Sequence, residues 1–392
     1  MNRLRMGPAH TPTPCANRRA PLAAMALCLA GVAGAAEVGP VEASGSGFLS
    51  AVAGKIVRGR SDPATDLGYL CPCFISDYGQ NGVYEHRGWQ FGPDSRLGLQ
   101  GTASVDAGRY SLTAQAVSRG SRQGAVDLEW MYATAAIDSD WTLQVGRKRL
   151  PLFLSSEVQD VGYALPWTHL APQLYGWEVV NYNGASLSYR HPFGDWLANA
   201  QVLYGKETVR DSGYWQIYNG KRTRTDTSWR HITGFEFKMS RDWFDVRAVL
   251  IQSTTQSRDL SAGETAYSSP AHQRIRGLSF NADNGTWVGR AEFLYIDRRE
   301  DYGFDHAQLY AAGHRFGPLL AMVSYANYRQ VVVAAPDTAE GHSTRTAVLR
   351  YDIGESTAVK LQYDIWRDKT APNYTSMHGD VQLISVAFDR VF

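Results

Sequence analysis

The sequence has few cysteines, almost no net charge and no long apolar run beyond its N-terminus. Four cysteines in 392 residues are too few for the disulfide framework of a small secreted domain. A formal net charge of +1 gives no reason to expect nucleic acid as a partner. The mean hydropathy is −0.31, and no internal apolar run approaches the roughly 20 residues of a membrane-spanning helix. A bundle of membrane helices is therefore excluded.

Sequence signatures of common enzymes and metal sites are also missing. The ten histidines form no HExxH arrangement, and no P-loop, GxGxxG or GxSxG motif occurs. His231, His306 and His314 fall in segments that we predict to be strands, but nothing pairs them with a nucleophile. We therefore expect no catalytic residues, no metal site and no cofactor.

The first 36 residues have the organisation of a secretory signal. Basic residues and no acidic ones precede an apolar stretch at 21–32, which ends in the small residues Ala33-Gly34-Ala35-Ala36. We expect cleavage after Ala36 or one residue earlier. Residues 1–36 would then be the signal peptide, 37–46 a leader, and 47–392 the folded domain of an exported protein. The run Ser44-Gly-Ser-Gly47, at the end of the leader, is interpreted as flexible.

From about residue 95 onward, segments alternate apolar and polar side chains. At 357–367, Val359 and Leu361 fall on one face, and Lys360 and Gln362 fall on the other. Alternation with a period of two predicts strands that have two different faces. The segments are about 9–11 residues long, which matches a tilted transmembrane strand better than the usual strand of about 5–6 residues in a soluble sandwich.

Short turns and long connections alternate between these strands. The short turns contain Gly, Asn or Asp, as in Ala107-Gly108 and Gly354-Glu355. Short turns on one rim and long loops on the other are typical of outer-membrane barrels, whose short turns face the periplasm. We predict sixteen strands, at 47–58, 95–106, 109–118, 126–138, 141–149, 183–191, 195–205, 231–240, 243–254, 273–282, 285–297, 305–315, 318–330, 344–352, 355–367 and 380–392.

The predicted fold is an all-β, transmembrane, antiparallel β-barrel. Every backbone N–H and C=O must be paired in hydrocarbon, so a sheet there has to close on itself. About sixteen strands enclose a lumen too wide for side chains to fill, and the predicted inward faces carry the charged and amide side chains. The sequence therefore predicts a water-filled pore.

The last residues, 384–392, alternate apolar side chains and end in Phe392. With the signal and the alternating strands, they resemble the Gram-negative outer-membrane porins over residues 44–392. The resemblance implies that Phe392, Phe388 and Val386 form an assembly signal read by the barrel-assembly machinery, although Arg390 departs from the usual apolar residue. It also implies a sixteen-stranded homotrimer in the outer membrane, with lipid and lipopolysaccharide around it and a third loop folded into the lumen.

The third long connection, at 150–182, would then form the constriction, or alternatively an exposed lid. It supplies two acids, Glu157 and Asp160. If these acids face basic wall residues across the lumen, a transverse field selects solutes by charge and polarity; alternatively, each wall charge belongs to an ion pair that braces the barrel. Arg147, Lys148 and Arg149 favour anions. The basic wall residues are Arg96, Arg190, Lys238, Arg247, Arg290, Arg350 and Lys360.

Three functions fit this pattern. The first is passive diffusion of small hydrophilic solutes and ions. The second is a channel selective for phosphate, acidic sugars or oligosaccharides, and the third is a closed structural or adhesive barrel. Cys71-Pro-Cys73 lies in the first long connection, where we expect a small-ring disulfide or free thiols, with an intermolecular bridge as a further alternative.

Overall fold

The computed structural model describes residues 35–38, 40–60, 67–298, 303–332, 335–371 and 379–392. The expected signal peptide falls almost wholly on residues 1–34, outside the described part. Within the described part, no helix is long and apolar enough to cross a bilayer.

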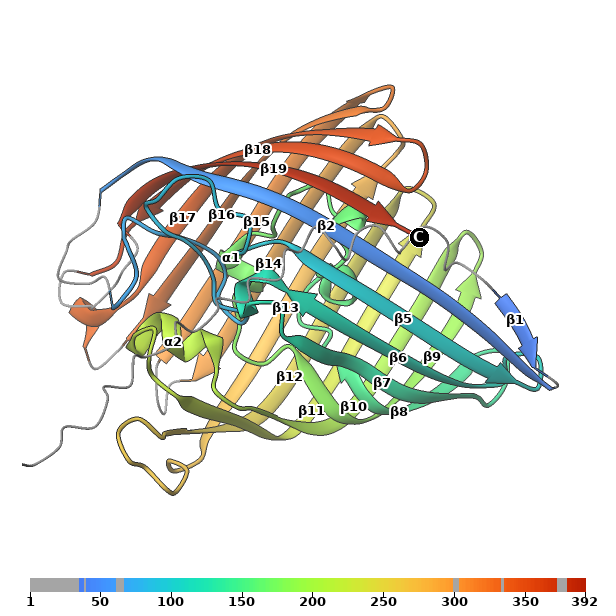
Figure 1. The fold of residues 1–392 in the computed structure, drawn as a ribbon. Coiled ribbons are helices and arrows are strands. Elements are labelled where there is room, and N and C mark those ends of the chain that lie inside the picture. The colour runs from blue at the N-terminus through green and yellow to red at the C-terminus, as the bar shows by residue number, and fades with distance from the viewer. Residues whose placement is uncertain (1–34, 39, 61–66, 299–302, 333–334, 372–378) are drawn as a thin grey trace, which may run out of the picture.

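Sixteen of the described strands form one closed antiparallel barrel, as the sequence predicts. Closure joins the two ends of the chain, because β19 pairs along most of β2, and Figure 1 shows these strands side by side. The strands are β2 (Val41–Arg60), β5 (Arg96–Val105), β6 (Tyr110–Arg119), β7 (Val126–Ala136), β8 (Trp141–Arg149), β9 (Asn181–Phe193), β10 (Trp196–Val209), β11 (Thr225–Arg241), β12 (Phe244–Asp259), β13 (Ala271–Asp283), β14 (Trp287–Arg298), β15 (Gly303–Phe316), β16 (Leu319–Val331), β17 (Gly341–Ile353), β18 (Thr357–Asp368) and β19 (Asp380–Val391).

The alternation places apolar side chains outside and polar ones inside. On β18, Val359 and Leu361 are 37% and 44% exposed on the outer surface, whereas Lys360 and Gln362 are each 1% exposed. The polar inner face of β18 is therefore shielded from solvent, whereas the inner wall of an empty, water-filled barrel would be exposed. Polypeptide inside the barrel accounts for this burial.

The barrel begins earlier in the chain than the sequence pattern predicts. Residues 41–46, which we expected to belong to a flexible leader, are part of β2 and pair with β5, and β1 (Ala35–Val38) pairs with the start of β2. Gly47 in this stretch has a packing role rather than a flexible one. A Cβ at Gly47 would lie 2.5 Å from the Phe392 ring, and the two residues exchange backbone hydrogen bonds of 2.6 and 2.9 Å.

Three long connections fold inward from one rim. Loop 1 (described residues 67–95) carries the hairpin β3 (Phe74–Asp77) and β4 (Gly82–Tyr84), and loop 4 (residues 210–224) carries α2 (Gly213–Asn219). Loop 3 (residues 150–180) carries the short helices η4 (Ser156–Val158), η5 (Gly162–Ala164) and α1 (Pro172–Tyr175). Figure 1 shows α1 within the barrel and α2 at the long-loop rim.

Apolar wall residues make this inward folding favourable. Leu150, Leu165 and Trp177 of loop 3 are buried in one cluster with inward-facing residues such as Ile251 and Leu309. A second cluster joins loop 1 and α2 to the inner faces of β2, β18 and β19. Burial of these side chains supplies the main free-energy gain that holds the loops inside.

Candidate functional site

Cations on the inner wall donate hydrogen bonds to the main chain of loop 3. Lys360 on β18 donates to the carbonyl oxygens of Gly162 at 2.7 Å and Trp167 at 2.9 Å. Arg350 on β17 donates to the carbonyls of Tyr163 at 2.7 Å and Leu165 at 2.9 Å. Loop 3 is therefore fixed to the wall far from the strands that it connects.

Side-chain contacts extend this attachment to more strands. Arg290 on β14 donates to Ser155 Oγ at 3.0 Å, and Tyr175 donates to Glu292 Oε1 at 2.8 Å. Arg247 on β12 forms an ion pair with Glu236 and donates to the carbonyl of Pro151. Loop 3 therefore crosses the lumen and reaches the opposite wall, which supports the constriction over the exposed lid.

Asp160 of loop 3 is the centre of a buried ionic cluster. It pairs with Arg119 at 2.9 Å, Arg96 at 3.3 Å and Arg149, and both Arg119 and Arg149 also pair with Glu129 on β7. Burial opposes the charge on Asp160, but the three guanidinium groups outweigh it and hold the pKa of this carboxyl well below its usual range. The cluster anchors the tip of loop 3 to β5–β8.

His169 joins loop 3 to loop 1 and to β18. Its imidazole lies 3.1 Å from Asp94 and 3.3 Å from Asp364, and all three side chains are at most 3% exposed. Burial disfavours the imidazolium, but the two carboxylates outweigh this effect and raise the pKa of His169 to about 10. His169 is therefore a buried cation at neutral pH.

Five of the seven wall cations selected from the sequence contact loop 3: Arg96, Arg247, Arg290, Arg350 and Lys360. Of the two loop acids, Asp160 is buried in contact with three arginines, so it does not face them across open water. For these residues the structure favours the bracing interpretation over the transverse field. Bracing is favoured because a charge that is buried and ion-paired contributes little to the electric field in the lumen.

The other two wall cations lie elsewhere. Arg190 is exposed near the short-turn rim, where its N–H bonds to the carbonyl of Asp140 at 2.8 Å. Lys238 on β11 is 39% exposed and pairs with Asp245 at 3.3 Å. Neither Arg190 nor Lys238 contacts loop 3 in the interactions described above.

A polar arc of the inner wall on β8–β12 remains partly accessible to solvent. It contains Lys148, Glu236, Lys238 and Asp245, none of which is buried. Glu157, at the tip of loop 3, is exposed and lies within electrostatic range of Lys148. Lys148 donates to Ser186 Oγ at 3.1 Å. The mixed charges of this arc can interact with a hydrated solute.

Sequence reasoning did not select Arg119, and it assigned Arg149 only a contribution to anion preference, although both are central to the Asp160 cluster. Each is the last residue of its strand, β6 and β8, at the rim that carries the long loops. Arginines at strand ends beside the predicted constriction loop were the signal that could have identified them.

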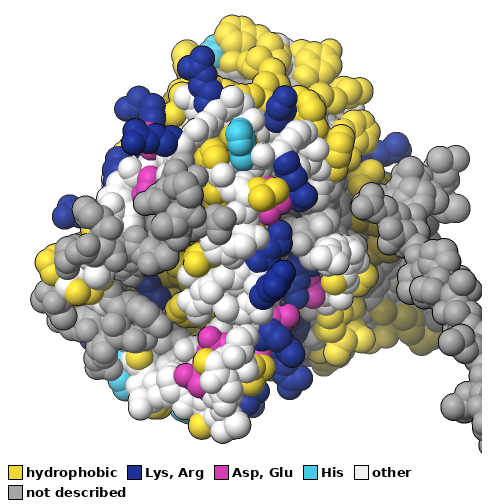
Figure 2. Space-filling model, turned by 60° about the vertical axis from the view of Figure 1, so that its left-hand side comes forward, with side chains coloured by type: hydrophobic (Ala, Val, Ile, Leu, Met, Phe, Trp, Pro, Cys, Tyr) yellow, Lys and Arg dark blue, Asp and Glu magenta, His cyan; other side chains and the backbone are white. Residues whose placement is uncertain are grey.

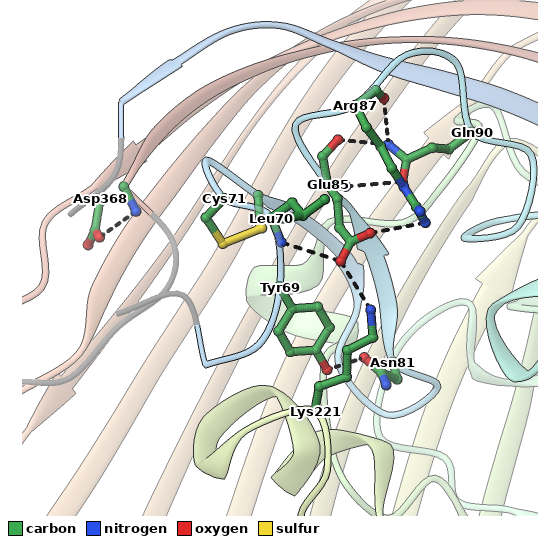
Figure 3. Close-up of a disulfide and its surroundings, with 11 residues drawn as sticks. Tyr69, Leu70, Cys71, Asn81, Glu85, Arg87, Gln90, Lys221 and Asp368 are labelled. Carbon is green, nitrogen blue, oxygen red and sulfur yellow. Dashed lines mark hydrogen bonds and ion pairs between the residues drawn. A yellow bond between two sulfur atoms is a disulfide. The ribbon is translucent and has the colours of Figure 1, made fainter. Parts of the chain in front are cut away.

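Loop 1, loop 2 (residues 120–125) and loop 4 surround a cavity of about 800 Å³ at the long-loop end. Its lining includes Trp89, Arg87 and Lys221. Figure 3 shows Glu85 between Arg87 and Lys221. Glu85 pairs with Arg87 at 3.0 Å and with Lys221 at 3.1 Å, so these ion pairs connect loop 4 to loop 1. Lys and Arg side chains, interspersed with acids, are numerous on this end of the molecule (Figure 2).

Cys71 and Cys73 form a disulfide beside these ion pairs, which agrees with the small-ring disulfide among the expected alternatives. Pro72 between them packs against β2, since a Cβ at Gly59 would lie 2.5 Å from the proline ring. The disulfide therefore sits where loop 1 leaves the wall (Figure 3).

The closed sixteen-stranded antiparallel barrel is the fold of the outer-membrane porins. The chain is similar to Salmonella typhi OmpF, solved in complex with daunomycin, with 10% identity over 91% of this chain and 100% of that chain and a TM-score of 0.59. It is also similar to the outer membrane channel DcaP of Acinetobacter baumannii, with 10% identity, coverage of 90% and 97%, and a TM-score of 0.56.

An anion-selective porin from Comamonas acidovorans is a third similar structure, with 14% identity, coverage of 90% and 100%, and a TM-score of 0.55. No protein-family model and no curated protein sequence matches the chain. At these identities the likeness establishes the fold, and the function must be argued from the lumen.

Proposed function

We propose that this protein is a porin of the Gram-negative outer membrane, through which small hydrophilic solutes and ions diffuse passively. The observation that carries the proposal is the polar, partly accessible arc on β8–β12 beside loop 3. Such side chains are costly in contact with lipid and are stable beside water. Loop 3 would narrow the pore, with Glu157 facing Lys148.

The location and assembly are part of this proposal. Residues 1–36 would direct export, and the terminal segment with Val386, Phe388 and Phe392 would be read by the barrel-assembly machinery. Val386 and Phe388 lie on the outer face, 39% and 41% exposed, where another protein can contact them. We propose a homotrimer surrounded by lipid and lipopolysaccharide, supported by the likeness to OmpF and to the anion-selective porin.

Planar-bilayer recording of the purified protein tests the pore. Stepwise conductance increases in KCl are expected, and their absence from protein with the heat-modifiable gel mobility of a folded barrel would contradict the proposal. Liposome swelling in neutral sugars then separates a pore from a closed structural barrel. Reversal potential in a salt gradient reports the charge preference, which we expect to be weak because cations and anions alternate along the arc.

A substrate-selective channel is a second candidate, favoured by the cavity at the long-loop end. Trp89 and Phe91 line it and are 50% and 66% exposed, and Arg87, Arg122 and Lys221 supply positive charge. Aromatic faces with cations suit an acidic sugar. Block of the current by glucuronate, but not by glucose, applied from the long-loop side would support this candidate; equal effects of both would contradict it.

A further inference from the structure

A row of basic side chains crosses the outer surface of β13–β16 near the long-loop rim. Arg276 on β13 is paired in register with Tyr295 on β14, Tyr295 with His306 on β15, and His306 with Arg329 on β16. Arg276, His306 and Arg329 are all exposed. The residue before each of them in its strand (Ile275, Asp305 and Tyr328) is buried inside the barrel, so the three polar side chains point outward.

The row lies close to the edge of the hydrocarbon layer. Trp287, at the short-turn end of β14, is 61% exposed on the same outer face as Tyr295, eight positions before it. At a rise of about 3.3 Å per residue and a tilt of about 40°, Tyr295 lies about 20 Å above Trp287. With Trp287 at the lower edge of an apolar band about 25 Å tall, the row lies about 5 Å below the upper edge, and its arginine side chains can extend to the lipid headgroups.

The geometry of the row calls for an anion. His306 and Arg329 lie directly opposite each other on neighbouring strands, so two side chains that can donate N–H hydrogen bonds meet on one outer face. The Arg276 guanidinium lies 5.9 Å from the centre of the Tyr295 ring, and the His306 ring lies 4.9 Å from it. Tyr295 therefore lies between Arg276 and His306 and contacts both.

A groove of about 610 Å³ runs beside the row. Its lining includes Arg276, His306 and Arg329 together with the amides Gln308 and Asn327. Further along the outer face, Arg274 and Arg345 are exposed as well, and Asp297 lies opposite Arg274 in the register. The groove thus offers guanidinium and amide donors above an apolar floor that includes Phe293 and Leu278.

We propose that this groove binds the phosphate headgroup of an anionic lipid in the leaflet facing the long loops. Guanidinium groups bind phosphate oxygens through charge-assisted hydrogen bonds, which strengthen where water is scarce. A lipid fits better than a free anion because the same groove continues into apolar wall that would contact acyl chains. Bound phosphate would also offset the positive charges of Arg276 and Arg329.

Native mass spectrometry of the detergent-solubilised protein tests this site, with phosphorylated lipid A and its dephosphorylated form as matched probes. The wild-type protein is expected to retain the phosphorylated form. The Arg276→Gln/Arg329→Gln variant is expected to bind it at least about tenfold more weakly, since charged hydrogen bonds are lost. Arg109→Gln/Arg241→Gln is the control, because it removes the same charge from exposed positions at the short-turn rim.

Several outcomes would overturn the proposal. Equal retention of the dephosphorylated lipid would show that phosphate is not recognised, and an equal loss in the control variant would show that only net charge matters. Complete displacement by inorganic phosphate at about 10 mM would indicate a free-anion site rather than a lipid site. Heat-modifiable gel mobility confirms that each variant is folded, and a result here is independent of whether the protein conducts.

Discussion

The carboxylate of Asp160, on loop 3, forms an ion pair with Arg119, the last residue of β6, at 2.9 Å. Arg96 and Arg149 complete the cluster around the same carboxylate. Asp160 and Glu129 thus supply most of the buried counter-charge of the three arginines, and Asp127 also pairs with Arg119.

Replacement of Asp160 by Asn should release the tip of loop 3. The substitution removes the negative charge that pairs with three buried guanidinium groups. Removal of one partner of a buried ion pair lowers the free energy of unfolding by on the order of 3–5 kcal/mol. We expect a lower unfolding temperature and larger, noisier unitary currents. Glu355→Gln, in an exposed short turn, is the matched control. Currents and stability like those of the wild type would show that the cluster does not hold the loop.

The His169 pair with Asp94 and Asp364 predicts a dependence of stability on pH. Because the pKa of His169 is raised to about 10 from about 6.5, its contribution is fully present below about pH 6.5 and is lost as the pH rises through about 10. His169→Asn should be less stable than the wild type at pH 6, by on the order of a few kcal/mol. The gap should close above pH 10.

Urea unfolding of the reconstituted protein between pH 6 and pH 10.5 measures this gap. His191→Asn is the control, since His191 pairs with Asp140 at a site where both side chains are partly exposed. A constant gap across the pH range would mean that His169 is not a buried cation.

Glu157 and Lys148 should act in opposite directions on ion selectivity. Neutralising Glu157 by Gln removes a negative charge from the proposed constriction and should raise the anion-to-cation permeability ratio by about twofold. Lys148→Gln should lower it by a similar factor. Reversal potentials in a KCl gradient report both effects. Shifts of the same sign, or none, would place these residues outside the conduction path.

Reduction of the Cys71–Cys73 disulfide should have a small effect on stability. The closed loop contains one residue between the two cysteines, so the loss of chain entropy in the unfolded state is small, and the expected cost of reduction is about 1.5 kcal/mol or less. Thermal unfolding with and without dithiothreitol, and of Cys71→Ser/Cys73→Ser, tests this. Loss of the folded barrel on reduction would contradict it.

Phe392→Ala should impair assembly in cells more than stability in vitro. We expect its outer-membrane yield to fall by about tenfold, whereas protein refolded in detergent should form the barrel with a modest loss from the missing ring contact with Gly47. Val391→Ala is the neighbouring control. Equal yields of Phe392→Ala and wild type in membranes would remove the assembly role.

The strands could be predicted because each depends on a local pattern. The faces of β18 are fixed by the alternation of Val359, Lys360 and Leu361, which continues through residues 362–365. The prediction was wrong near the N-terminus, where Gly47 was interpreted as part of a flexible run. The Phe392 ring packs on Gly47, and this contact between distant parts of the sequence could not be inferred locally.

The arrangement of the lumen could not be predicted in the same way. Lys360 and Gly162 are 198 residues apart, and nothing in either local sequence indicates their hydrogen bond. Arg350 and Lys360 were predicted to face the lumen, and a side chain that faces a lumen can meet water or an inserted loop. The choice between these depends on the path of loop 3 across the barrel, which is a property of the whole fold.

In addition to apolar burial and the Asp160 cluster, cations of the wall bind loop 3 through its carbonyl oxygens, at Pro151, Gly162, Tyr163, Leu165 and Trp167. Every amino acid provides this acceptor, so an exchange of side chains in the loop leaves these bonds available. Evolution can accordingly revise the chemistry of the passage one substitution at a time while the backbone stays docked. A new nutrient preference would not require a new architecture.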